Sequence, residues 1–273
     1  MRIYALAVYL FLYIPIGIIT LFSFNSGHAA SQFQGFSVQW YGKVLHNTFV
    51  VEAFKTSLTV ALISSLLATV FGTMAALALQ SVRGRVRVAF DALIYIAVMV
   101  PGIVIGIATL IALVTLFNWL NPILSALWPL AEGVPQLSLG TGSLIAAHGL
   151  FAMALVIIIV RARIAGMDRS LIEASADLGA TPFGTFRQVT LPQIFPGILA
   201  GFLLAFTFSF DDFIIAFFVA GSKTTLPIYV FSSIRRGVTP EINAIGTMVL
   251  TVSLCLLIVA QSILQRGRSA AKA

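Results

Sequence analysis

Long apolar stretches alternate with short polar segments along the whole chain. Six of them approach or exceed the ~20 residues with which a helix crosses the hydrocarbon core of a bilayer. Strands of a membrane barrel would be about 10 residues long and would alternate in polarity. The pattern therefore predicts an all-α membrane protein with six transmembrane helices, at residues 4–24, 54–80, 89–116, 141–160, 197–220 and 244–264.

Two local features refine these spans. Pro101 and Gly102 should kink or interrupt the third span near its start, since proline removes a helical hydrogen bond. Residues 25–53 form an expected outer loop, in which Trp40 and Tyr41 suit a membrane interface. The first apolar run exceeds the ~7–15 residues of a signal-peptide core, so we expect it to remain as a span.

The composition agrees with a membrane protein. Hydrophobic residues make up 59% of the chain and charged residues only 9%, whereas an average soluble domain carries about 25% charged residues. So few charges could not cover the surface of a water-soluble domain of this size. The apolar content also excludes a disordered chain.

We attribute the net charge of +7 to the topology of a membrane protein and not to nucleic-acid binding. With both termini in the cytoplasm, 11 of the 16 Lys and Arg residues lie in cytoplasmic segments and 5 lie in outer segments. Cytoplasmic loops of membrane proteins carry an excess of these residues. The distribution therefore predicts an N-in, C-in topology.

The cytoplasmic segment 161–196 is longer than a simple turn and carries its own helix signals. Ser170 and Glu173 have capping-box spacing at the start of a first short helix, and Gly179 suits its end. Thr181 and Pro182 suit the start of a second short helix, with threonine as the N-cap. The segment thus predicts two short helices with a sharp corner between them.

The second short helix should run through Phe183 and Phe186 and end at Leu191-Pro192. An exposed corner that carries two phenylalanines would leave apolar surface in water unless a partner covers it. A connector that packs on its own helices is the alternative.

The spacing in this segment resembles the EAA loop of ABC importer permeases. Glu173-Ala174-Ser175 is followed by Gly179, and then by Leu191-Pro192, with serine in place of the family's second alanine. The resemblance implies a type I (MetI-like) permease fold over residues 1–273, as a single transmembrane domain with a coupling helix near 180–187 that docks on an ATPase. The implied coupling residues are Glu173, Ala174, Ser175, Asp177, Gly179, Ala180, Thr181, Pro182, Phe183, Phe186, Arg187, Leu191 and Pro192.

The chain has no ATPase motif of its own. Gly221-Ser222-Lys223-Thr224 lacks the P-loop spacing. ATP and Mg²⁺ are therefore expected on a separate subunit, and we expect no catalytic residue and no cofactor here. No metal site is expected either, because the histidines are far apart in sequence; they are His28, His46 and His148.

Asp211 and Asp212 are the only acids well inside a predicted span, where each would cost about 2.5–3.5 kcal/mol on insertion scales. On a continuous helix Asp211 would share a face with Thr207 and Phe208, and Asp212 with Phe208 and Ser209. Carboxylates beside aromatic rings suit an organic cation in a substrate pathway. The alternative is that these acids pair with another helix and serve assembly.

These acids also narrow the resemblance. Ser209–Phe213, together with Gly35-Phe36-Ser37 and Pro240–Ala244, is similar to permeases of polyamine importers, which carry spermidine or putrescine across the bacterial inner membrane. That likeness implies a second homologous permease, two copies of an ABC ATPase, an extracytoplasmic substrate-binding protein, membrane lipid around the helices, and no nucleic acid.

Two rival functions stay open at this point. A secondary transporter of a small organic cation, driven by an ion gradient, would explain acids inside a span but leaves the EAA loop without a purpose. An intramembrane enzyme could use the two acids as acid and base. Adjacent helical residues point in different directions, however, and suit such a pair poorly.

Overall fold

The computed structural model describes residues 2–28, 32–127 and 136–270. Within these ranges the regular structure is helical, apart from one isolated β-bridge between Asn25 and Phe36. The chain forms two compact units, of which the first joins Met1–Lys55 to Leu226–Ala273 and the second is Thr56–Thr225. Helix α3 (Thr48–Ala78) contributes residues to both units.

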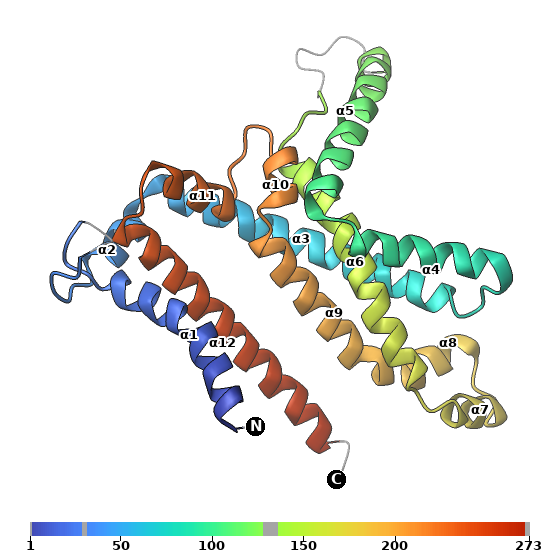
Figure 1. Cartoon of the computed structure of the whole chain (residues 1–273). Coiled ribbons are helices and arrows are strands. Elements are labelled where there is room, and N and C mark those ends of the chain that lie inside the picture. Colours follow the sequence, from blue (N-terminus) through green and yellow to red (C-terminus); the bar gives the residue numbers. More distant parts are fainter. Residues whose placement is uncertain (1, 29–31, 128–135, 271–273) are drawn as a thin grey trace. The chain divides into compact units, whose positions relative to one another are not determined.

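The first unit is built on a long helix pair. Helix α1 (Arg2–Ser23) packs along α12 (Pro240–Ala270), and the start of α1 lies at the same end of the pair as the end of α12 (Figure 1). Short helices α2 (Gln39–His46) and α11 (Leu226–Arg236) complete this unit. Trp40 of α2 is only 5% exposed, and its indole N–H donates to the carbonyl oxygen of Asn25 at 2.7 Å.

The second unit is centred on α6 (Thr141–Ala165) and α9 (Leu191–Asp211), which pack side by side (Figure 1). Gly197 permits this approach, because a Cβ atom there would lie 2.7 Å from Cβ of Arg163. Helix α4 (Gly84–Met99) packs on α6, and α5 (Gly102–Leu127) packs on α10 (Ile214–Val219). The buried core of this unit includes Val156, Val160 and Ile194.

Among the described residues, five helical segments are long and apolar enough to cross a membrane: Tyr4–Ser23, Thr48–Ala78, Gly102–Leu127, Thr141–Ala165 and Pro182–Asp211. A sixth and shorter apolar stretch is Pro240–Cys255, at the start of α12. This result confirms an all-α protein with several apolar helices.

Two predicted spans differ from the helices observed. The predicted span 89–116 is two helices, α4 and α5, because Val100 before Pro101 is extended (φ −67°, ψ 133°). The expected interruption at Pro101-Gly102 is thus confirmed. The predicted span 197–220 is wrong at both ends, since α9 begins at Leu191 and ends at Asp211, before the separate α10.

Candidate functional site

The first candidate region is the corner segment, residues 168–191, which contains α7 (Ser170–Asp177) and α8 (Pro182–Thr185). The predicted capping box does not form, because the residue before α7 is Arg169 and it makes no side-chain cap. Asp168 takes over this role, since its Oδ1 accepts the backbone N–H of Ser170 at 2.9 Å. The hydroxyl and the backbone N–H of Ser170 both hold the pKa of the Asp168 carboxyl below its ordinary value.

Gly179 ends α7 as the spacing predicted. Its φ of +75° lies in the left-handed region, which favours glycine. The N–H of Gly179 donates to the carbonyl oxygen of Ala176 at 2.9 Å, and that of Ala180 donates to Ser175 at 3.1 Å. This pair of bonds is the Schellman motif, which turns the chain sharply away from the helix axis.

The far side of the corner is also built from neighbouring residues. Thr181 caps α8, and its Oγ1 accepts the N–H of Gly184 at 3.2 Å. The hydroxyls of Ser175 and Thr185 lie 2.9 Å apart and join α7 to α8. The serine that replaces the family's second alanine therefore forms a hydrogen bond across the corner, which the sequence pattern alone does not reveal.

Leu191-Pro192 does not end a helix, contrary to the prediction. Residues Phe186–Thr190 form a π-helical turn, η1, in which the N–H of Leu191 donates to the carbonyl oxygen of Phe186. Pro192 has no N–H to offer the carbonyl oxygen four residues earlier, and the wider turn fits this gap in the hydrogen-bond ladder. The chain is therefore helical without a break from Pro182 to Asp211.

The corner segment presents apolar side chains on its outside. Leu178 is 88% exposed and Phe183 is 72% exposed, whereas Phe186 is half-buried. Polar and small residues of the predicted coupling set surround them and are also exposed; they are Glu173, Ala174, Asp177, Ala180, Thr181, Pro182 and Arg187. Leu191 and Pro192, which complete that set, lie in the first turn of α9.

The second candidate region is the α9–α10 break, residues 211–213. Helix α9 ends at Asp211, and Asp212 is extended (φ −70°, ψ 120°). The two acids therefore do not follow each other on one helix, so the predicted shared face of Asp212 with Phe208 and Ser209 does not arise from helical spacing. Asp212 instead faces the start of α10, where its Oδ2 accepts the N–H of Ala216 at 2.9 Å.

A buried polar network surrounds Asp212. Its Oδ2 lies 3.4 Å from Nε2 of His148, a residue of α6 that is only 3% exposed. Nδ1 of the same ring lies 2.8 Å from Oγ of Ser209, and this oxygen lies 2.9 Å from Oγ of Ser64 on α3. Three helices of the second unit thus meet at the break through side chains.

Asp211 has a different environment. It is exposed at the last turn of α9, and no hydrogen bond or ion pair of its side chain occurs among the described residues. Thr207 lies one turn earlier, and its hydroxyl donates within the helix to the carbonyl oxygen of Leu203 at 2.9 Å. Phe208 is 47% exposed. The structure therefore brings Phe208, Ser209 and Asp212 together and leaves Asp211 outside the buried network.

The sequence did not lead us to expect His148 in this network, because we considered the histidines only as metal ligands. One signal was available: His148 is a polar residue at the centre of a predicted span, and such residues face partners rather than lipid. Its partner Ser209 lies 61 positions away, so no local pattern could identify the pair.

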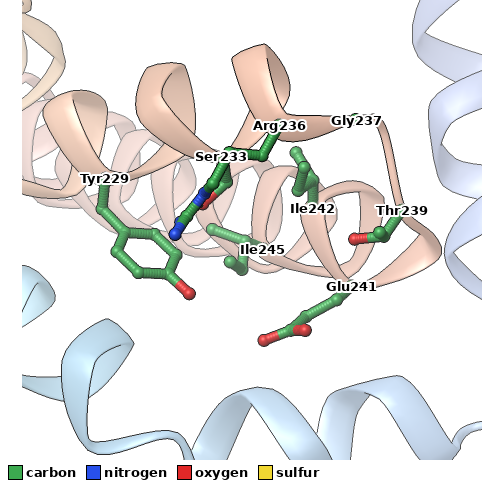
Figure 2. A pocket seen from close by; sticks show the side chains of 8 residues that line it. All are labelled: Tyr229, Ser233, Arg236, Gly237, Thr239, Glu241, Ile242 and Ile245. Carbon is green, nitrogen blue, oxygen red and sulfur yellow. The ribbon is translucent and has the colours of Figure 1, made fainter.

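A pocket in the first unit has a volume of about 210 Å³ (Figure 2). Tyr229, Ser233 and Arg236 of α11 line one side, and Glu241 and Thr239 line the other. Asn47 ties the two sides together, since its amide donates to Glu241 Oε1 at 3.0 Å and to Tyr229 Oη at 3.3 Å.

The sequence of the chain matches a known family of transport proteins. Residues 68–267 match the family described as "Binding-protein-dependent transport system inner membrane component". The chain belongs to this family. It is therefore a multi-pass inner membrane permease, a transport component and not an enzyme.

Relatives of this permease carry specific names. It is 39% identical to "Putrescine transport system permease protein PotI" of Escherichia coli (strain K12) over 243 residues, which cover 88% of this chain and 82% of the relative. It is 35% identical to "Spermidine/putrescine transport system permease protein PotC" of the same strain over 258 residues, which cover 94% and 90%.

Solved structures share the fold of this permease. A chain of a bacterial ABC transporter that imports the acidic polysaccharide alginate superposes with a TM-score of 0.74 at 18% identity, covering 97% of this chain and 94% of that one. A chain of the MetNI methionine ABC transporter gives a TM-score of 0.62 at 17% identity, covering 80% and 96%. The MetI-like permease fold expected from the sequence is therefore the fold observed.

Proposed function

We propose that this permease forms half of the membrane pore of an ATP-driven importer for a polyamine such as putrescine or spermidine. The observation that carries the proposal is the 39% and 35% identity to two polyamine permeases over most of the chain. The carboxylates at the α9–α10 break are consistent with it, because they suit a cationic cargo. Family membership favours ATP coupling over an ion gradient.

Six spans with both termini in the cytoplasm are the proposed topology. The pairing of α1 with α12 supports it, because the start of one helix lies beside the end of the other. The excess of Lys and Arg in the segments assigned to the cytoplasm supports the same orientation. A second homologous permease would complete the pore.

The corner segment is the proposed contact with the ATPase. Its exposed Leu178 and Phe183 would be covered by a groove of the partner, which removes apolar surface from water. Two copies of that ATPase would bind ATP and Mg²⁺ and hydrolyse the nucleotide. An extracytoplasmic substrate-binding protein would deliver the cargo to the opposite face.

Asp211 is the proposed open carboxylate of the substrate pathway, by which we mean a carboxylate without a partner among the described residues. A negative charge at the C-terminus of a helix is unfavourable, since it faces the negative end of the helix dipole. Nothing in the described part of the chain compensates it, so a role in stability does not account for this residue. A passing cation would supply the missing partner.

The test is reconstitution. The tagged chain is purified from bacterial membranes with the proteins that accompany it and inserted into vesicles loaded with ATP and Mg²⁺, and the substrate-binding protein is added outside. We expect an ATPase and a second permease to co-purify, and radiolabelled putrescine to enter only with ATP. Uptake that continues without ATP and stops when ion gradients are collapsed would contradict the proposal and support a gradient-driven transporter.

A further inference from the structure

A small cavity lies beside the α9–α10 break, inside the second unit. Its volume is about 10 Å³, which leaves room for about one water-sized group. The lining residues come from α6, α9, α10 and the break between the last two; they are His148, Phe151, Ala152, Phe208, Ser209, Asp212 and Ile215. The cavity is therefore small, polar on one side and aromatic on another.

The protons of the network determine what the polar side offers. Each hydroxyl has one proton to donate. Oγ of Ser64 lies 2.9 Å from Oγ of Ser209 and 3.4 Å from the carbonyl oxygen of Ala61, and either serine hydroxyl can donate to the other. When Ser209 donates to Ser64, Oγ of Ser209 accepts from the imidazole, and Nδ1 of His148 is then the protonated nitrogen.

In this arrangement Nε2 of His148 carries no proton and is a hydrogen-bond acceptor. The atom is buried and has no hydrogen-bond partner among the described residues. Its nearest charged neighbour is Oδ2 of Asp212 at 3.4 Å, which is beyond the usual range for an N–H···O bond and is itself an acceptor. Oδ2 of Asp212 already accepts the N–H of Ala216, so the buried Nε2 is the acceptor that still requires a donor.

An ammonium group supplies this donor. It carries three N–H bonds and a positive charge, so it can donate to both Nε2 and the carboxylate. The rings of Phe151 and Phe208, with centroids 6.1 Å apart and planes inclined by 59°, add aromatic surface that attracts cations. The size of the cavity admits a primary ammonium group and excludes a quaternary one.

We infer that His148 and Asp212 form a binding site for one primary ammonium group of the cargo, with Phe151 and Phe208 beside it. The inference rests on the proposed function and adds two residues, His148 and Phe151, to the pathway. Asp212 then holds the leading ammonium group in a recess, while Asp211 remains available to the rest of the cation.

The experiment uses the full chain with its co-purified partners in lipid nanodiscs, with ¹⁵N-labelled histidine. Nitrogen resonances are followed while methylammonium is added, and His148→Gln identifies the His148 signals. We expect Nε2 of His148 to be unprotonated before addition and to shift saturably with methylammonium. Tetramethylammonium should leave it unmoved, and the signals of His28 and His46 serve as internal controls.

Two variants test the recess by the same titration. Asp212→Asn should weaken methylammonium binding about tenfold or more, the usual effect of losing a hydrogen bond to a charged group. Glu241→Gln is the matched control, since it removes a carboxylate from the pocket of the first unit, and it should bind as the unaltered chain does.

Several results would overturn the inference. One is a doubly protonated His148 that methylammonium does not change, because this state is an internal ion pair with Asp212. A second is an unprotonated Nε2 that does not respond, which means that only water occupies the cavity. Loss of methylammonium binding in Glu241→Gln alone would show that the ammonium group binds in the pocket of the first unit. Failure of ATP-driven putrescine uptake by the unaltered complex is a separate result that contradicts the proposed function and leaves the titration valid.

Discussion

The corner segment and the α9–α10 break lie in the same unit but are held together in different ways. Side-chain bonds of the corner join near neighbours, and the longest of them, from Ser175 to Thr185, spans 10 positions. The bonds at the break join His148 to Ser209 over 61 positions and Ser64 to Ser209 over 145. One region is fixed by local sequence and the other by packing of distant helices.

This difference separates two kinds of sensitivity to mutation. A local motif depends on backbone conformation at a few positions, so a single backbone change destroys it. A network between helices depends on polar groups that satisfy one another, so a change of one atom alters its charge or its proton order without altering the helices.

The largest effect is expected at the turn of the corner. Gly179→Pro cannot adopt the φ of +75° and lacks the N–H that donates to Ala176, a disruption that costs about 3 kcal/mol or more. ATP-driven putrescine uptake should fall to background and less ATPase should co-purify. Gly179→Asn, which tolerates this conformation, should retain uptake; loss of function in both variants would mean that the space at this position matters and not the backbone.

The next effect concerns the exposed apolar surface. Phe183→Glu removes a side chain that is 72% exposed and whose burial against a partner would contribute about 1.5–3 kcal/mol. ATPase association, measured by quantitative co-purification, should weaken about 10- to 100-fold, while the melting temperature of the isolated chain stays the same. Phe183→Leu should keep most of the binding. A fall in melting temperature with normal ATPase binding would show that Phe183 packs inside the permease.

A smaller effect is expected at the open carboxylate. Asp211→Asn removes the charge from an exposed position, where ion pairs contribute about 0.2–1 kcal/mol. The initial rate of putrescine uptake should fall about two- to fivefold, and Asp211→Glu should restore it. Unchanged uptake with loss of the second permease from the purified complex would instead support a role in assembly.

The smallest effect is expected for Ser175→Ala. The variant loses the bond to Thr185, worth about 1 kcal/mol, and regains part of this as better helix propensity. Uptake should change by less than about twofold. A double-mutant cycle with Thr185→Val, read by melting temperature, isolates the hydrogen bond. Coupling near zero would show that the two hydroxyls bond to water instead.

The sequence predicted the corner well because its signals are local. Gly179 and Thr181 act as the spacing of caps predicts. Two details were wrong: the capping box of Ser170 and Glu173 does not form, and a π-helical turn carries the helix past Pro192. The interruption before α5 was also predicted, from Pro101 and Gly102. These features depend on backbone chemistry that a few neighbouring residues determine.

The break was predicted less well because its cause is not local. Nothing in residues 209–213 indicates that α9 should stop between two acids. The stop coincides with contacts that Asp212 makes with Ala216 and His148, and the second of these depends on how α6 packs against α9. Helical periodicity grouped Asp212 with Phe208 and Ser209, and the structure does bring these residues together, but through the break and not along one helix.

The unbroken helix from Pro182 to Asp211 has a mechanical consequence. Its 30 residues make a rod about 45 Å long, with Phe183 near one end and Asp211 at the other. A rigid rod transmits a push or a rotation at one end to the other without any change in its own hydrogen bonds. The π-helical turn at 186–190 and the internal Pro196 both interrupt the regular hydrogen bonds of this helix, so the movement that reaches Asp211 depends on how far the helix bends at these two points.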